Sequence, residues 1–254
     1  MRKDEEKRGD SFFAEGAVSI LSILKNHSRP VSRILFLPEI KREEKNISRL
    51  LSLAKKEKVP MELSTQSFFE THTTGHTHGG VIAEVGERKL SSLKEVFSDP
   101  KGFVFYLCGI EDPFNFGSAV RSFYAAGATG MVLAPRNWMS AAGVVIRSSA
   151  GATEAIPCAV AQDREELFLL AKQSGYKVVC ASETRSVPLF SADLKKPLFL
   201  IIGGEKRGIN KDLLEKADLC VRIPYARPVS LSLTAADASA VCAFEVLRQN
   251  QKTV

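Results

Sequence analysis

The sequence predicts an α/β protein in which a mostly parallel sheet follows a smaller α/β domain. The first observation is a series of continuous apolar runs of strand length, which is typical of strands buried on both faces of a parallel sheet. The second is that helical segments separate these runs. We expect the strands of the larger sheet at residues 103–108, 130–133, 155–160, 177–181, 198–202 and 219–223. With 254 residues, 44% of them hydrophobic, the chain can bury the core that such a sheet needs.

The first 97 residues predict a small α/β domain of their own. Its expected elements are a helix that begins at Phe12, a second helix at 47–56, and strands at 32–37, 61–63 and 81–85. Residues 88–102 contain the turn-forming pair Asp99-Pro100 and favour a linker. We therefore expect two domains, at residues 1–97 and 98–254.

The second domain contains a turn followed by a helix whose residues suggest a function. Its helices are expected at residues 117–126, 139–151, 164–174, 211–216 and 233–248. Asn115 precedes the first of them, as helix N-cap or ligand contact. Arg121 is then expected in the first turn, where the helix dipole disfavours a cation, and this suggests a functional task, with an ordinary surface arginine as the alternative.

The strand at 198–202 ends in the glycine pair Gly203-Gly204, with Glu205 and Gly208 close behind. Ligands of open α/β sheets bind beyond the carboxyl ends of the strands, and glycines let the backbone approach a ligand closely. An ordinary strand-to-helix turn is the alternative. A Walker-type phosphate loop is excluded, because no lysine followed by a hydroxyl residue ends this segment.

Composition excludes several classes of protein. No run of about 18 apolar residues predicts a membrane span, and the charged start MRKDEEKRGD lacks the apolar region of a secretory signal. The five cysteines lie far apart, mostly in apolar runs, and predict reduced core residues of a cytoplasmic protein. The net charge of +6 is shared equally by the two predicted domains and is compatible with a polyanionic partner.

Three of the four histidines, His72, His76 and His78, lie in the stretch ETHTTGHTHGG. A metal site there would need further ligands, and no cysteine and few carboxylates accompany the histidines. We therefore expect no metal, and interpret the stretch as a surface loop that could touch RNA.

Three segments in order resemble one family, the SpoU or TrmH-type branch of the SPOUT RNA methyltransferases. These are DPFNFGSAVRS, the strand end with Gly203, Glu205 and Gly208, and IPYARPVSLSLTAADASA, with RSSAGATEAIP as a further similarity. The resemblance covers residues 103–250. Residues 12–85 resemble, more weakly, the small substrate-binding domain that many members carry.

The resemblance implies a deep trefoil knot that binds S-adenosylmethionine, in a homodimer whose active site lies at the subunit interface. It implies methyl transfer to a ribose 2′-hydroxyl of RNA, with ribosomal RNA preferred to tRNA. Arg121 would bind the adjacent phosphate and favour the ionised ribose oxygen, because an arginine stays protonated. The implied catalytic residues are Arg121, Asn115, Glu205 and Ser232, and the implied cofactor-binding residues are Gly203, Gly204, Ile223 and Leu231.

Two departures from the family pattern leave alternatives open. Ser230-Leu231-Ser232 stands where the family often has Ser-Leu-Asn, and the preceding loop lacks a glycine often found there. Either departure could shift the cofactor contacts that involve Ser230 and Ser232. A tRNA 2′-O-methyltransferase and a catalytically silent cofactor- or RNA-binding homologue are the alternative functions. A guanine-N1 methyltransferase of the superfamily would need a different arrangement of catalytic carboxylates. Asp237, on the last expected helix, is the acid near the third motif that could serve, with a helix-face residue as the alternative.

Overall fold

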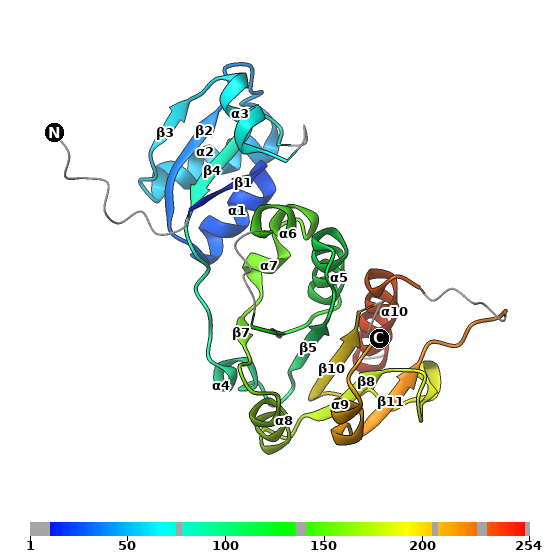
Figure 1. Ribbon diagram of the computed structural model, residues 1–254. Coiled ribbons are helices and arrows are strands. Elements are labelled where there is room, and N and C mark those ends of the chain that lie inside the picture. The colour runs from blue at the N-terminus through cyan, green and yellow to red at the C-terminus, as the bar shows by residue number, and fades with distance from the viewer. Residues whose placement is uncertain (1–10, 75–77, 136–140, 205–207, 228–232, 252–254) are drawn as a thin grey trace. The chain divides into compact units, whose positions relative to one another are not determined.

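The computed structural model describes residues 11–74, 78–135, 141–204, 208–227 and 233–251 (Figure 1). Its contacts divide the chain into two compact units. The first unit comprises Met1–Lys89 and Asn137–Ala155, and the second comprises Leu90–Arg136 and Ile156–Val254. The segment 137–155 therefore packs with the N-terminal unit, although it lies between two strands of the second unit along the chain.

The first unit is built on a sheet of four strands. They lie in the order β1 (Phe12–Glu15), β4 (Val81–Val85), β2 (Val31–Phe36) and β3 (Met61–Leu63). β4 is antiparallel to both of its neighbours, whereas β3 is parallel to β2. Strand alternation places Ile34 and Phe36 in the core beneath α1 (Ala17–Asn26) and α2 (Lys45–Lys56). Leu35 and Leu37 face the other way, toward α3 (Gln66–His72).

Two expectations for this unit were wrong. Residues from Phe12 onward form β1 rather than the start of a helix, and Gly16, with φ 84°, turns the chain before α1 begins. Apolar residues on both sides of the turn imitate one helical pattern, but only glycine adopts that backbone readily. The helix α3 was also missed; the Thr65 hydroxyl caps it by accepting from the backbone N–H of Phe68.

Segment 137–155 contains two short helices, α6 (Ala142–Ser148) and α7 (Ala152–Ala155), where one helix was expected. The left-handed residues Ala150 and Gly151, at φ 51° and 79°, separate them. α6 packs on β1, and α7 packs on α1.

Two buried ion pairs hold this segment to the rest of the first unit. Arg147 Nη1 lies 2.6 Å from Glu15 Oε2, and Arg29 Nε lies 3.0 Å from Glu154 Oε2. The Ser28 hydroxyl also donates to Glu154 at 2.6 Å. The Glu154 side chain is 1% exposed, so its charge depends on these two partners for the interactions that water would otherwise provide.

The second unit confirms the predicted parallel sheet. Its strands lie in the order β7 (Cys158–Val160), β6 (Gly130–Leu133), β5 (Phe103–Cys108), β10 (Leu198–Gly203), β8 (Lys177–Ala181), β11 (Leu219–Arg222) and β9 (Val187–Pro188). Every one of these neighbours pairs in parallel. β7 is shorter than expected because residues 152–155 are helical, and the two-residue β9 was not predicted.

Helices cover both faces of this sheet. α4 (Leu93–Val96), α8 (Arg164–Gln173) and α9 (Lys211–Lys216) pack on the face that presents Val104 and Tyr106. On the opposite face, α5 (Pro113–Ala125) stacks the ring of Phe123 on that of Phe105, with centroids 4.1 Å apart. α10 (Ala235–Asn250) packs beside α5 and on β10, and the short 3₁₀ helix η1 (Leu189–Ser191) contacts α10.

All five cysteines are free and buried, as the sequence predicted. Burial raises the pKa of the Cys180 and Cys242 thiols to about 12, so both stay protonated and unreactive near neutral pH. No helix among the described residues is long and apolar enough to cross a membrane.

We expect Glu154→Ala to destabilise the first unit strongly. The substitution leaves the Arg29 guanidinium, whose side chain is 7% exposed, without its carboxylate, and breaking such a buried pair costs about 3–5 kcal/mol. Urea unfolding should show a decrease of this size in the free energy of unfolding. Glu165→Ala, which removes the 80% exposed partner of Lys216, should cost less than about 1 kcal/mol. If both variants lost the same free energy of unfolding, the claim that the buried ion pair stabilises the protein more than the exposed one would be wrong.

Candidate active site

The carboxyl edge of the second sheet brings together several of the predicted site residues. In the register of the sheet, Ile202 of β10 and Val221 of β11 both pair with Ala181 of β8. Gly204 and Ile223 therefore each lie two residues beyond the residue that is level with Ala181. Because β8 lies between β10 and β11, the two residues are two strand spacings apart, about 10 Å. Ile223 is half-buried at this edge.

The glycine pair is packed against backbone. The N–H of Gly204 donates to the carbonyl of Cys108 at 2.6 Å, and the N–H of Gly208 donates to the carbonyl of Gly204 at 2.9 Å. A Cβ on Gly204 would overlap the carbonyl of Gly109, and one on Gly203 would lie 2.6 Å from the carbonyl carbon of Gly208. The glycines are thus required by the chain's own turns, a reason that the sequence did not reveal.

Gly109 belongs to the same edge and was missed as a site residue. It follows β5 directly, has φ 79°, and lies against Gly204. The sequence could have identified it, because Gly109 directly follows a predicted buried strand, as Gly203 does.

The helix after β5 begins earlier than predicted, so Asn115 is not its N-cap. α5 starts at Pro113, and its N-cap is Asp112, whose carboxylate accepts from the N–H of Asn115 at 2.7 Å. Proline at the first helical position after an aspartate is a known start signal. Asn115 is therefore the third residue of the helix and is half-buried.

The earlier start also moves Arg121 out of the first turn. Arg121 is the ninth residue of α5, so the expected conflict with the helix dipole was wrong. Its side chain is exposed and makes no ion pair within the described part of the chain. Six residues separate it from Asn115, a rise of about 9 Å, so the two side chains lie on different turns.

Phe114 shares the outward face of α5 with Arg121. Seven residues separate them, nearly two turns, and the Phe114 side chain is 51% exposed. Tyr124 at the end of α5 and Phe244 on the neighbouring α10 are also exposed, by 47% and 49%. The two neighbouring helices α5 and α10 therefore both expose aromatic rings, and we call their exposed surface, which includes Arg121, the α5–α10 face.

Three predicted site residues, Glu205, Leu231 and Ser232, lie outside the described residues. The ends of the loop that contains the last two are tied together, because the Tyr225 hydroxyl accepts from the backbone N–H of Leu233 at 3.1 Å. Tyr106, on β5 below this edge, has its pKa raised to about 12, first by burial and then by the Cys108 thiol. It stays protonated and is no candidate for a general base.

The histidine stretch does not form one cluster in the described chain. His72 ends α3 and stacks on the Phe68 ring at 3.9 Å, whereas His78 is buried against Phe69. His76 lies outside the described residues. Among those that are described, no group of three or more His, Cys, Asp and Glu could hold a metal ion.

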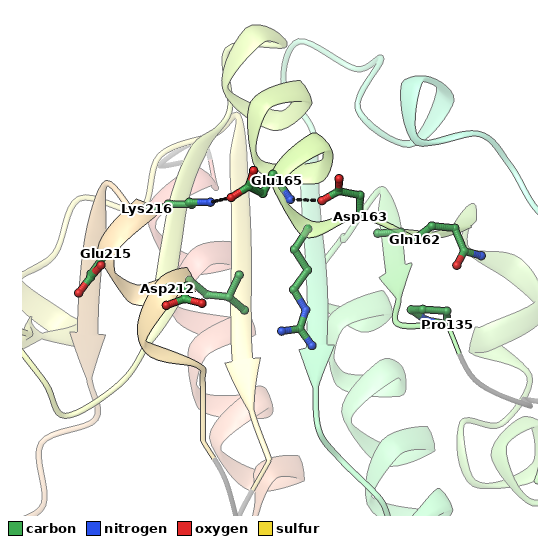
Figure 2. A pocket seen from close by; sticks show the side chains of 10 residues that line it. Pro135, Gln162, Asp163, Glu165, Asp212, Glu215 and Lys216 are labelled. Atoms are coloured by element: carbon green, nitrogen blue, oxygen red, sulfur yellow. Dashed lines mark hydrogen bonds and ion pairs between the residues drawn. The ribbon is translucent and has the colours of Figure 1, made fainter.

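A cavity of about 810 Å³ opens on the α8–α9 side of the sheet, and Figure 2 shows its side chains. Four carboxylates and two cations line it: Asp163, Glu165, Asp212, Glu215, Arg164 and Lys216. Lys216 pairs with Glu165 at 2.6 Å, and the Asp163 carboxylate caps α8. The excess of acids disfavours RNA, and no predicted site residue lines the cavity.

Comparison with known protein families gives two matches. The model described as the SpoU rRNA Methylase family matches residues 102–244. The model described as RNA 2′-O ribose methyltransferase substrate binding matches residues 13–90. The two matches together cover most of the chain.

Individual proteins agree with these families. A 23S rRNA (guanosine-2′-O-)-methyltransferase RlmB of Pseudomonas putida is 31% identical over 242 residues, 93% of this chain and 96% of the relative. A putative TrmH family tRNA/rRNA methyltransferase YacO of Bacillus subtilis is 29% identical over 206 residues, 79% and 82% of the two chains. The crystal structure of an AdoMet-bound rRNA methyltransferase from Sinorhizobium meliloti superposes with a TM-score of 0.80 at 24% identity, over 95% of this chain and 88% of that chain, and supports the fold.

We expect Gly204→Ala to weaken S-adenosylmethionine binding at least tenfold. The added methyl group overlaps the Gly109 carbonyl and pushes apart the two turns that form the carboxyl edge. Calorimetric titration measures the affinity. The matched control is Gly175→Ala, at φ 81° with nothing within 4 Å of the new Cβ, which should cost about 1 kcal/mol of stability and leave the affinity unchanged. If the Gly204 variant bound S-adenosylmethionine as tightly as the wild type, the proposed contribution of Gly204 to cofactor binding would be wrong.

Proposed function

Because the chain belongs to the SpoU rRNA methylase family, we propose that it transfers the methyl group of S-adenosylmethionine to a ribose 2′-hydroxyl of ribosomal RNA. The observation that carries the proposal is the near full-length similarity to a 23S rRNA (guanosine-2′-O-)-methyltransferase, together with the family match at residues 102–244. This similarity favours ribosomal RNA over tRNA, and a guanosine of 23S rRNA is the substrate that it suggests.

The residues at the carboxyl edge fit S-adenosylmethionine. Gly203 and Gly204 would let the backbone approach the cofactor closely, while Ile223 and Leu231 would offer apolar surface to the adenosine. Support comes from the tight packing of Gly204 on Gly109, which leaves backbone rather than side chains along this part of the edge, and from the half-buried side chain of Ile223. When bound, S-adenosylmethionine would supply an electrophilic methyl carbon, and the demethylated remainder would leave as a neutral thioether.

The protein's part in the reaction is to position the ribose and to favour its ionised oxygen. The ribose 2′-hydroxyl would lose its proton to solvent as its oxygen takes the methyl group. Arg121, which stays protonated, would bind the adjacent phosphate and stabilise the negative charge on that oxygen. Asn115, Glu205 and Ser232 would orient the arginine and the loops. The exposed Arg121 side chain, without an ion pair in the described chain, leaves its donors available for RNA.

The active form would be a homodimer joined through the α5–α10 face. The exposed rings of Phe114, Tyr124 and Phe244 support this, because water-exposed aromatic residues are typical of protein interfaces. Arg121 would then lie at the subunit boundary, beside Phe114 on the outward face of α5.

We also propose a division into two domains within the linker at residues 88–102, with RNA binding in the first domain, on which α6 and α7 also pack, and a deep trefoil knot in the second. The separate family matches at 13–90 and 102–244 support the division. The close approach of the loop after β10 to the turn after β5 is compatible with a knot. The reduced buried cysteines suit a cytoplasmic enzyme.

The reaction is tested with RNA from cells that lack this gene. The purified protein, protein-free 23S rRNA from those cells and S-adenosylmethionine with a labelled methyl group should yield one 2′-O-methylnucleoside, identified by digestion and mass spectrometry. The same nucleoside should be present in 23S rRNA of cells that contain the gene. Label on a base, or transfer to tRNA alone, would contradict the proposal.

We expect Arg121→Ala to reduce turnover by about 100-fold or more, because a charged donor to the transition state is lost. Its affinity for S-adenosylmethionine should stay the same by calorimetry, since Arg121 acts on the RNA. Lys172→Ala removes one charge from α8, where Lys172 pairs with Asp218, and should retain full turnover. Near-normal turnover in the Arg121 variant would exclude this mechanism.

We expect the double variant Tyr124→Asp/Phe244→Asp to be monomeric. Two carboxylates on the α5–α10 face would be buried without partners in a dimer, at a cost of several kcal/mol. Light scattering should give twice 27.8 kDa for the wild type and 27.8 kDa for the variant. Leu169→Asp, at a 59% exposed position on α8, should remain dimeric. A monomeric wild type would rule out the dimer.

A further inference from the structure

The helix α2 of the first unit has two contrasting faces. Ile47, Leu50 and Ala54 are buried and pack in the core with α1. Lys45, Arg49 and Lys56 are all exposed, and helical geometry places them on the side opposite that core. We call these three residues the α2 cationic face.

The spacing along this face is regular. Four residues separate Lys45 from Arg49 and seven separate Arg49 from Lys56, so the three cations follow one another over about 16 Å of helix. Ser52 is the remaining residue on this side of the helix, and its hydroxyl donates to the Ser48 carbonyl at 3.0 Å. The face therefore has three positive charges and no acid.

Within the described residues, the cations of this face make no ion pair with the carboxylates that are near them in the sequence, Glu43, Glu44 and Glu57. No ion pair in the described part of the chain involves Lys45, Arg49 or Lys56. In the second unit, by contrast, Lys172, Lys177 and Lys216 each pair with a carboxylate at 2.9, 3.4 and 2.6 Å. A solvated helix face ordinarily mixes both signs of charge, so charges of one sign indicate an anionic partner.

Lys45 lies where helix stability alone would disfavour it. It is the first residue of α2, at the positive end of the helix dipole, and the first turn contains no acid. More cations surround the face: Lys41 and Arg42 precede the helix, and Lys55 and Lys58 lie near its end, all exposed. Residues 41–58 contain seven basic and three acidic side chains.

We infer that the α2 cationic face is the surface through which the first unit binds the RNA phosphate backbone. This inference rests on the proposed function, since it specifies where the RNA of that reaction is held. Three exposed cations in a row suit successive phosphates, and their flexible side chains read no base. The contact would hold a large folded RNA and leave the choice of nucleotide to other residues.

The test compares two triple variants with the same change in charge. The first, Lys45→Gln/Arg49→Gln/Lys56→Gln, removes the α2 cationic face. The control, Lys172→Gln/Lys177→Gln/Lys216→Gln, removes three ion-paired lysines of the second unit, of which Lys172 and Lys216 are exposed and Lys177 is half-buried. Thermal denaturation first establishes that both variants are folded. The probe is fluorescently labelled 23S rRNA from cells that lack the gene, and binding is measured without S-adenosylmethionine between 50 and 200 mM salt.

We expect the first variant to bind this RNA about 10- to 100-fold more weakly at 50 mM salt. Its plot of log K against log salt should be shallower by about two to three, since each lost phosphate contact reduces the slope by about 0.7–0.9. The control should change neither the RNA affinity nor the salt slope.

Exchanging lysine and arginine, in Lys45→Arg/Arg49→Lys/Lys56→Arg, should keep wild-type RNA binding. In the methylation reaction, the glutamine variant should show a raised KM for RNA with kcat nearly unchanged.

Equal weakening in the glutamine variant and the control would assign the effect to overall charge and overturn the inference. Wild-type binding by the glutamine variant would overturn it as well. RNA binding by the wild type with no methyl transfer would refute the proposed function alone, because the binding measurement needs no reaction. Absence of RNA binding by the wild type would overturn both.

Discussion

The parallel pairing of β10 with β5 is the contact on which the second unit depends. It joins residues almost a hundred positions apart, from Leu198 opposite Phe103 to Gly203 opposite Cys108. The pairing continues past the strand ends, where the Gly204 N–H reaches the Cys108 carbonyl. Because a side chain on Gly204 would occupy the space of Gly109, this approach exists only with glycine. The pairing of the central strands therefore also fixes the position of the backbone at the candidate site.

Local patterns predicted the sheet of the second unit well. Buried strands such as β5 and β8 are continuous apolar runs of strand length, which is the pattern of a strand covered on both faces. The start of α5 was predicted less well, since Asp112 and Asn115 are both good N-caps and only the proline at position 113 distinguishes them. The error mattered, because the argument for Arg121 from the helix dipole depended on it.

Other features have no local pattern that could predict them. Glu15 and Glu154 are acidic residues in a sequence with many, and only the folded chain brings Arg147 and Arg29 to them. The short strand β1 looks like the start of α1 until the backbone of Gly16 is known. The reason for Gly204 is similar, since its packing partner Gly109 lies 95 residues away and cannot be read from the loop itself. The roles of Glu205, Leu231 and Ser232 stay predictions from resemblance.

The docking of α6 and α7 on the N-terminal sheet affects how this protein can be divided for experiments. A fragment that ends at the linker omits Arg147 and Glu154, and would retain Glu15 and Arg29 as buried charges with no counterion. Its β1 edge would also lose the helix that packs against it. The complementary fragment would retain α6 and α7 with their apolar faces uncovered. Expression of either half alone therefore requires new partners for these surfaces, or a boundary that transfers residues 137–155 with the sheet they stabilise.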